Sequence, residues 1–191
     1  MFKSSLEFKD NFCDAGNFSI STYPLCNHNP YDEKVIYEDH NQVQRLGANV
    51  LARLLCMNAY GRCIPVFSNI KASTFLNSGS KVPQPTPLEI TDIQFPGEPN
   101  HLDYVVEAFQ FYTDYSTNLY DTQYARCIGT FEDIPPRTLD NTDGVFYHFG
   151  LFLSSFKDVE EYMFAYKYIP TGIIYPEGFG LKVRWDIRLS A

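Results

Sequence analysis

The sequence predicts a mainly β protein, an antiparallel β-sandwich of jelly-roll or immunoglobulin-like type, and three observations favour this class. Aromatic residues make up 16% of the 191 residues, mostly Phe and Tyr, which strands accommodate well. The second half of the chain contains short runs in which apolar and polar side chains alternate. Turn signals rich in Gly, Pro, Asn and Asp separate these runs, as they do in sandwiches.

The first 40 residues show no sustained hydrophobic period and are rich in Asn, Asp, Ser, Tyr and Pro. We interpret residues 1–40 as an extended arm that docks on the chain's own domain or on a neighbouring subunit. The alternative for this region is a short strand or two joined by loops. Residues 41–191 then form the domain, in which one helix precedes the sandwich.

One segment, residues 41–58, has the spacing of an amphipathic helix. Asn41 can cap its first turn, and Gly61 follows its last apolar position. The side chains that share its apolar face are Val43, Leu46, Val50, Leu51, Leu54 and Leu55. This is the N-terminal amphipathic helix of the predicted domain.

The strands are expected in the second half of the chain. Residues 105–112 alternate over their whole length and are predicted as one strand. The last strand has the clearest alternation, with Trp185 on its apolar side and charged residues on the other. The remaining strands are expected at 124–131, 145–153 and 162–169, and the turns between strands at 140–144, 170–172 and 176–178.

Strand 162–169 is predicted to place four aromatic rings, those of Tyr162, Phe164, Tyr166 and Tyr168, on one face. Three of the rings are Tyr, whose hydroxyl groups need a partner or water. The face therefore either lines the core near its edge or meets another subunit. The candidate interface residues, from the arm and from this strand, are Phe18, Ile20, Tyr23, Tyr162, Phe164 and Tyr166.

Charge and composition exclude several classes of partner. The net charge is -8 and no two basic residues are adjacent, which argues against direct nucleic-acid binding. No stretch approaches the ~20 apolar residues of a membrane-spanning helix, so no membrane contact is expected. The five Cys residues are odd in number and widely spaced, which is typical of free thiols in a reducing compartment.

Motifs for catalysis and for metal binding are weak. Cys26-x-His28 and the Cys56–Cys63 pair lack zinc-ligand spacing, and no nucleophile elbow or phosphate-binding loop occurs. His148 is interpreted as a hydrogen-bonded strand histidine rather than a base. We therefore expect no enzyme activity, no cofactor and no metal ion. A weak glycan-binding set is expected on a polar loop, and it comprises Tyr112, Asp114, Tyr115 and Tyr120.

The order of elements from residue 43 onward resembles a group of tailed-bacteriophage structural proteins. That group opens with an amphipathic helix, followed by a Gly-containing loop and a Pro-Leu step, matched by Ser78-Gly79-Ser80 and Pro87-Leu88. Three strand motifs follow in order, and they are matched by His148-Phe149-Gly150-Leu151-Phe152, by Phe164–Ile169 and by the terminal Val183-Arg184-Trp185-Asp186-Ile187. His148 departs from the group, in which an acidic residue is expected, and the Gly loop is poorer in Gly.

The resemblance implies a virion building block: a tail-fibre, baseplate, neck or head-decoration subunit. Its expected partners are copies of itself and other virion proteins, and its expected location is the virion, assembled in the host cytoplasm. Strand edges and arms tie neighbours together in such assemblies. The alternative is a carbohydrate-binding sandwich at a fibre tip, with a host glycan as ligand.

Overall fold

The structure is a computed structural model that describes residues 16–26, 32–40, 65–74, 95, 105–115, 124–132, 145–155, 161–174 and 176–188. These residues form nine strands: β1 (Asn17–Pro24), β2 (Lys34–His40), β3 (Pro65–Ser73), β4 (Val105–Glu107), β5 (Gln110–Tyr115), β6 (Tyr124–Phe131), β7 (Val145–Ser155), β8 (Glu161–Ile174) and β9 (Phe179–Arg188). The mainly β prediction is confirmed. No α-helix lies in the described ranges, and the helix expected over 41–58 and the turn expected over 140–144 lie outside them.

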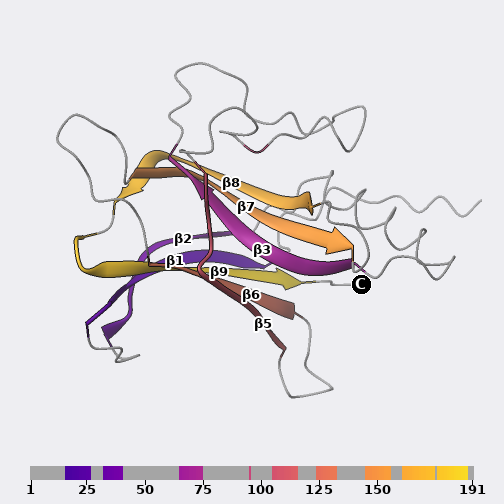
Figure 1. The fold of residues 1–191 in the computed structure, drawn as a ribbon, viewed down its shortest axis with the longest axis horizontal. Helices are drawn as coiled ribbons and strands as arrows, with labels where there is room; N and C mark the ends of the chain where they lie inside the picture. Colours follow the sequence, from indigo (N-terminus) through magenta and orange to yellow (C-terminus); the bar gives the residue numbers. More distant parts are fainter. Residues whose placement is uncertain are drawn as a thin grey trace, which may run out of the picture.

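The strands build two antiparallel sheets that lie one above the other in Figure 1. The five-stranded sheet has the order β2-β1-β9-β6-β5, and the four-stranded sheet has the order β4-β3-β7-β8. Strand β1 pairs with β2, β3 with β4, β5 with β6 and β7 with β8. These successive pairs lie alternately in the five-stranded and in the four-stranded sheet. Strand β9 then enters between β1 and β6, so the last described strand joins the two pairs of the five-stranded sheet.

One apolar core lies between the sheets and is built from both of them. The Phe18 ring of β1 lies 4.7 Å from the Trp185 ring of β9 and 5.7 Å from the Phe149 ring of the other sheet, measured between centroids. The alternation predicted for the last strand is confirmed, because its four inward side chains are at most 2% exposed: Leu181, Val183, Trp185 and Ile187. Each large apolar side chain buried in this way contributes roughly 1.5–3 kcal/mol.

The single strand predicted over 105–112 is wrong, because the chain changes sheets in its middle. Strand β4 pairs with β3 in the four-stranded sheet, and β5 pairs with β6 in the five-stranded sheet. The N–H of Ala108 donates to the carbonyl of Ile70, whereas the N–H of Phe109 donates to the carbonyl of Thr130. Two neighbouring residues thus bond to different sheets, which a hydrophobic period does not reveal.

The arm predicted over residues 1–40 is not supported. Residues 17–24 and 34–40 are β1 and β2 of the five-stranded sheet, and β1 lies in its interior between β2 and β9. Of the two interpretations, short strands agree better with the described residues 17–24 and 34–40. Phe18 and Ile20 are fully buried, since the alternating positions of β1 face the core.

The prediction that strand β8 places its four aromatic rings on one face is wrong. Leu151 pairs with Ala165 and Phe152 pairs with Met163, so Phe164 is the extra residue of a β-bulge. The bulge shifts the alternation, and Phe164 joins the core between the sheets. Tyr166 instead belongs to a second apolar cluster on the other face of the four-stranded sheet, which comprises Phe95, Phe152, Met163 and Tyr166.

The turn predicted at 170–172 is also wrong, whereas the turn at 176–178 is confirmed. Strand β8 continues to Ile174, and the four residues 169–172 lie opposite Tyr147 of β7 alone. Gly172 has a φ of +66°, a left-handed conformation that glycine adopts readily. The Pro-Thr-Gly signal therefore marks an irregularity inside a strand rather than the end of one.

Candidate interaction edge at strand β2

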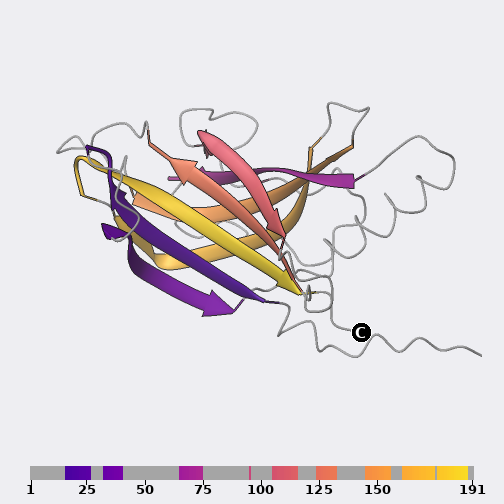
Figure 2. The ribbon, with the colours of Figure 1, turned by 90° about the horizontal axis from the view of Figure 1, so that it is seen from below.

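Strand β2 is the outermost strand of the five-stranded sheet beside β1, as Figure 2 shows. No other described strand pairs with its free edge. Its ladder with β1 is interrupted, because Ile20 pairs with Tyr37 and Ser21 pairs with Val35, which leaves Ile36 without a cross-strand partner. Val35 is 51% exposed and Ile36 is 38% exposed. An edge strand with exposed apolar side chains is a template for pairing with another chain.

Tyr37 fastens the middle of β2 to the core. Its ring meets the Phe18 ring edge to face, with centroids 6.1 Å apart. Its hydroxyl donates to Oδ2 of Asp39 over 3.1 Å. Burial, together with this hydrogen bond to a carboxylate, raises the pKa of Tyr37 to about 12.

Asp39 connects the far end of β2 to the other sheet, a contact that we call the Asp39 clamp. The ammonium group of Lys167, on β8, donates to Oδ2 of Asp39. Lys167 pairs with the core residue Phe149, and its side chain is only 10% exposed, whereas that of Asp39 is 42% exposed. The hydrogen bond from Lys167 lowers the pKa of Asp39 below its ordinary value.

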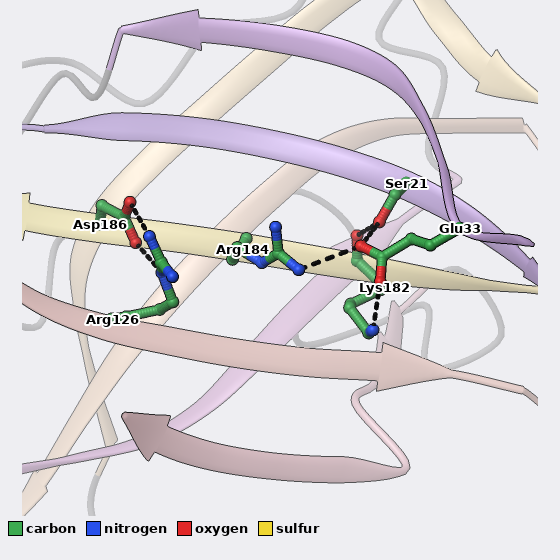
Figure 3. Close-up of polar contacts among 6 residues, drawn as sticks. All are labelled: Ser21, Glu33, Arg126, Lys182, Arg184 and Asp186. Carbon is green, nitrogen blue, oxygen red and sulfur yellow. Dashed lines mark hydrogen bonds and ion pairs between the residues drawn. The ribbon is translucent and has the colours of Figure 1, made fainter. Parts of the chain in front are cut away.

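Glu33 holds the start of β2, a contact that we call the Glu33 clamp. Its carboxylate accepts hydrogen bonds from Ser21 Oγ (2.6 Å) and from Lys182 Nζ (2.5 Å). Arg184 Nη2 adds a third, over 3.1 Å, and Figure 3 shows the three donors converging on this carboxylate from β1 and β9. Burial alone would raise the pKa of Glu33, but the bonds from Lys182 and Ser21 and the positive charges of Lys182 and Arg184 lower it overall.

The same face of the sheet carries two further polar contacts. Arg126 Nε and Nη2 donate to the two carboxylate oxygens of Asp186, over 2.7 and 2.9 Å (Figure 3). The hydroxyl of Tyr23 donates to Glu132 over 2.8 Å. The Arg126–Asp186 pair joins the neighbouring strands β6 and β9, whereas the contacts of Tyr23 with Glu132 and of Glu33 with the two β9 cations span an intervening strand. The network thus fixes strand positions on this face.

The structure buries five of the six candidate interface residues inside the chain itself. Phe18, Ile20 and Phe164 lie in the core between the sheets, and the Tyr166 ring lies in the second cluster. Tyr23 is 3% exposed, with its hydroxyl bonded to Glu132. The side chain of Tyr162 lies outside the described part. The aromatic strand faces thus fill this chain's own core, which leaves these five side chains no free area for a partner.

The glycan-binding candidates lie partly on a strand instead of the expected loop. Tyr112 is in β5, opposite Ile128, and is 47% exposed. The backbones of Asp114 and Tyr115 also belong to β5, but their side chains lie outside the described part, as does Tyr120. The structure therefore shows Tyr112 as an exposed ring, and the side chains of the other three candidates lie outside its described part.

The histidine and cysteine candidates that the structure describes show no catalytic or metal-binding arrangement. The interpretation of His148 as a hydrogen-bonded histidine is confirmed: it is 1% exposed, with Nδ1 2.7 Å from the Tyr166 hydroxyl. Burial raises the pKa of Cys127 to about 12, whereas Cys26 is exposed. Within the described ranges no cluster of three potential metal ligands occurs, and no helix there could span a membrane. His28, Cys56 and Cys63 lie outside those ranges.

Sequence reasoning missed both clamps. The solvated face of the last strand was visible as Lys182 and Arg184, but their carboxylate partner, Glu33, lies 149 residues before Lys182 in the chain. Lys167 was visible as a lone charge among aromatic residues, which is a signal for a buried ion pair. Its partner could not be found, because no pattern connects β8 with β2.

Comparison of the chain with protein-family models, with curated protein sequences and with solved structures finds no match. The resemblance to phage structural proteins therefore stays a prediction that depends on the order of the sequence motifs.

Proposed function

We propose that this chain is a structural subunit of a tailed-bacteriophage virion that works by packing against copies of itself or neighbouring virion proteins. The two-sheet antiparallel architecture is compatible with such a building block. The three strand motifs of the resemblance fall on β7, β8 and β9, which supply much of the core. In this proposal the protein acts in the virion, assembled in the host cytoplasm, without catalysis or a cofactor.

The observation that carries the proposal is the free edge of β2. Its exposed apolar residues Val35 and Ile36 lie next to each other on a strand that is fixed at both ends by the two clamps. A strand edge held in place in advance loses little conformational freedom when another chain pairs with it. The first expected partner is a second copy of this chain.

The test is the solution mass of the full chain by light scattering. We expect an oligomer that V35K/I36K converts to monomer, because two charges on the edge oppose strand pairing. The matched control is I174K, since Ile174 is a similarly exposed apolar residue (53%) at the end of β8. A monomeric wild type, or a double variant of unchanged mass, would contradict self-assembly through β2. Deleting residues 1–40 is not a usable test, because it removes β1 and β2.

A carbohydrate-binding module is the second candidate, and the exposed Tyr112 ring favours it. By strand register, Tyr112, Ile128 and Arg184 follow one another across three strands of one face, beside the Arg126–Asp186 pair. An exposed ring next to charged hydrogen-bonding groups is a surface on which a sugar can stack. Binding on a glycan array that Y112A abolishes and F109A retains would support this candidate, and a blank array would oppose it.

A further inference from the structure

We infer that β2 is a separately releasable strand, which detaches from the edge of the sandwich at acid pH while the other described strands stay folded. The inference concerns a single protomer and does not depend on the proposed function. It arises from how little of β2 is buried and from where its two clamps lie.

The packing of β2 is weak compared with that of its neighbour β1. Tyr37 is the β2 residue that packs against the core, and no residue of the strand is fully buried. The bulge at Ile36 also interrupts the ladder to β1. By contrast, β1 pairs on both sides and buries Phe18 and Ile20 completely. Segments with few buried apolar contacts open with a smaller free energy than the whole domain needs to unfold.

The two clamps bracket this weakly packed strand. Glu33 immediately precedes β2, and Asp39 is its penultimate residue. The Glu33 clamp reaches Ser21 on β1 and two cations on β9, and the Asp39 clamp reaches Lys167 on β8. Both anions come from the β2 segment and all the cations come from other strands. Among the described residues, protonating these two carboxyls therefore removes every ion pair between the β2 segment and the rest of the sandwich.

The groups around the clamps favour release once the carboxyls are neutral. Lys182 and Arg184 then lie on the same strand face without the counter-charge of Glu33. Lys167 is left as a nearly buried ammonium, which is costly without its anion. Detachment of β2 hydrates Lys167. The other titratable neighbours among the described residues are Tyr23 and Tyr37, which stay neutral in acid, and Glu132, which accepts from the Tyr23 hydroxyl. The exposed titratable side chains of the β2 segment are Asp32, Lys34, Glu38 and His40.

The direction of the pH effect follows from the lowered pKa values of Glu33 and Asp39. A carboxyl with a lowered pKa in the folded state stabilises that state fully above its ordinary pKa, about 4. This contribution is lost as the pH falls through the lowered value. The clamps are therefore closed at neutral pH and open in acid.

Hydrogen exchange of the full chain at a series of pH values, corrected for the intrinsic exchange rate, tests the inference. We expect amides of residues 34–40 to lose protection at a higher pH than amides of β9, such as those of 181–187. Simultaneous loss in both segments would overturn the inference, since β2 would then open only with the whole domain.

A second arm of the experiment uses variants at neutral pH. E33Q/D39N mimics protonation and should speed exchange in residues 34–40 by roughly tenfold for each lost clamp, and these residues should exchange faster than those of β9 in the variant as in the wild type. The matched control is E38Q, which removes a negative charge from the same strand where it forms no ion pair among the described residues. If the double variant does not fold, the single variants E33Q and D39N serve in its place. Wild-type protection of β2 in the clamp variants would overturn the inference.

Discussion

The two open sides of the sandwich are closed in different ways. On one side the edges are β4 and β5, and the chain itself crosses between the sheets through Ala108 and Phe109. On the other side the edges are β2 and β8, and the described contact between them is the pair of Asp39 and Lys167 with Tyr37 beside it. The first closure is covalent and backbone-bonded, whereas the second depends on charge. We call the first the permanent side of the sandwich, because the backbone itself closes it. We call the second the conditional side, because its closure requires the charge of Asp39.

The largest expected loss in the free energy of unfolding comes from a substitution at the crossover, on the permanent side. A Cβ at Gly129 would lie 3.0 Å from Ala108 Cβ and 3.2 Å from Ile70 Cβ, so a side chain there presses directly on the crossover. We expect G129V to lower the free energy of unfolding by about 3 kcal/mol, because the added methyl groups overpack this contact. Urea unfolding measures it. G129A should cost less, and equal stability of wild type and G129V would show that the crossover is loosely packed.

The next effect distinguishes the two partners of the Asp39 clamp. D39N leaves the nearly buried Lys167 ammonium without its anion and should cost about 2 kcal/mol. K167M leaves only the partly exposed Asp39, which water can solvate, so its cost should stay within about 1 kcal/mol. The comparison is made by urea unfolding of both variants at neutral pH. A greater loss in K167M than in D39N would contradict the described burial of Lys167.

The smallest expected loss in the free energy of unfolding comes from a substitution on the conditional side that removes no charge. Y37F keeps the ring against Phe18 but deletes the hydroxyl that donates to Asp39. We expect a loss of about 1 kcal/mol in the free energy of unfolding, the usual contribution of such a hydrogen bond. Thermal or urea unfolding at neutral pH measures it. An unchanged stability would indicate that the hydroxyl is equally well solvated by water.

The alternation of the sequence predicts individual strands well where they are regular. The last strand shows this most clearly, since each of its apolar positions from Leu181 to Ile187 faces the core. The hydrophobic period mispredicts which side of a strand faces the core where a bulge or a crossover interrupts the strand. Phe164 is the extra residue of a bulge, and Ala108 and Phe109 bond to different sheets, so the expected faces of both segments shift.

Strand partners were beyond prediction for a physical reason. Alternation shows which side of a strand is apolar, but not which strand lies beside it. The pairing of β1 with β9 therefore could not be foreseen, and the sequence of residues 1–40 indicates an arm instead. The clamps have the same origin, since Asp39 meets Lys167 from 128 residues away. Five of the six expected interface residues are buried, because aromatic content marks a core as readily as a surface.

The most direct test of the two-sided account is the free energy of unfolding of wild type, D39N and G129V, measured at pH 7 and at the lowest pH where the wild type stays folded. In acid the wild-type Asp39 is protonated and resembles Asn, since its contribution is lost as the pH falls through its lowered pKa. The charge-dependent closure at Asp39 predicts that the D39N deficit shrinks toward zero in acid, while the G129V deficit stays the same. A D39N deficit that persists unchanged in acid would contradict it.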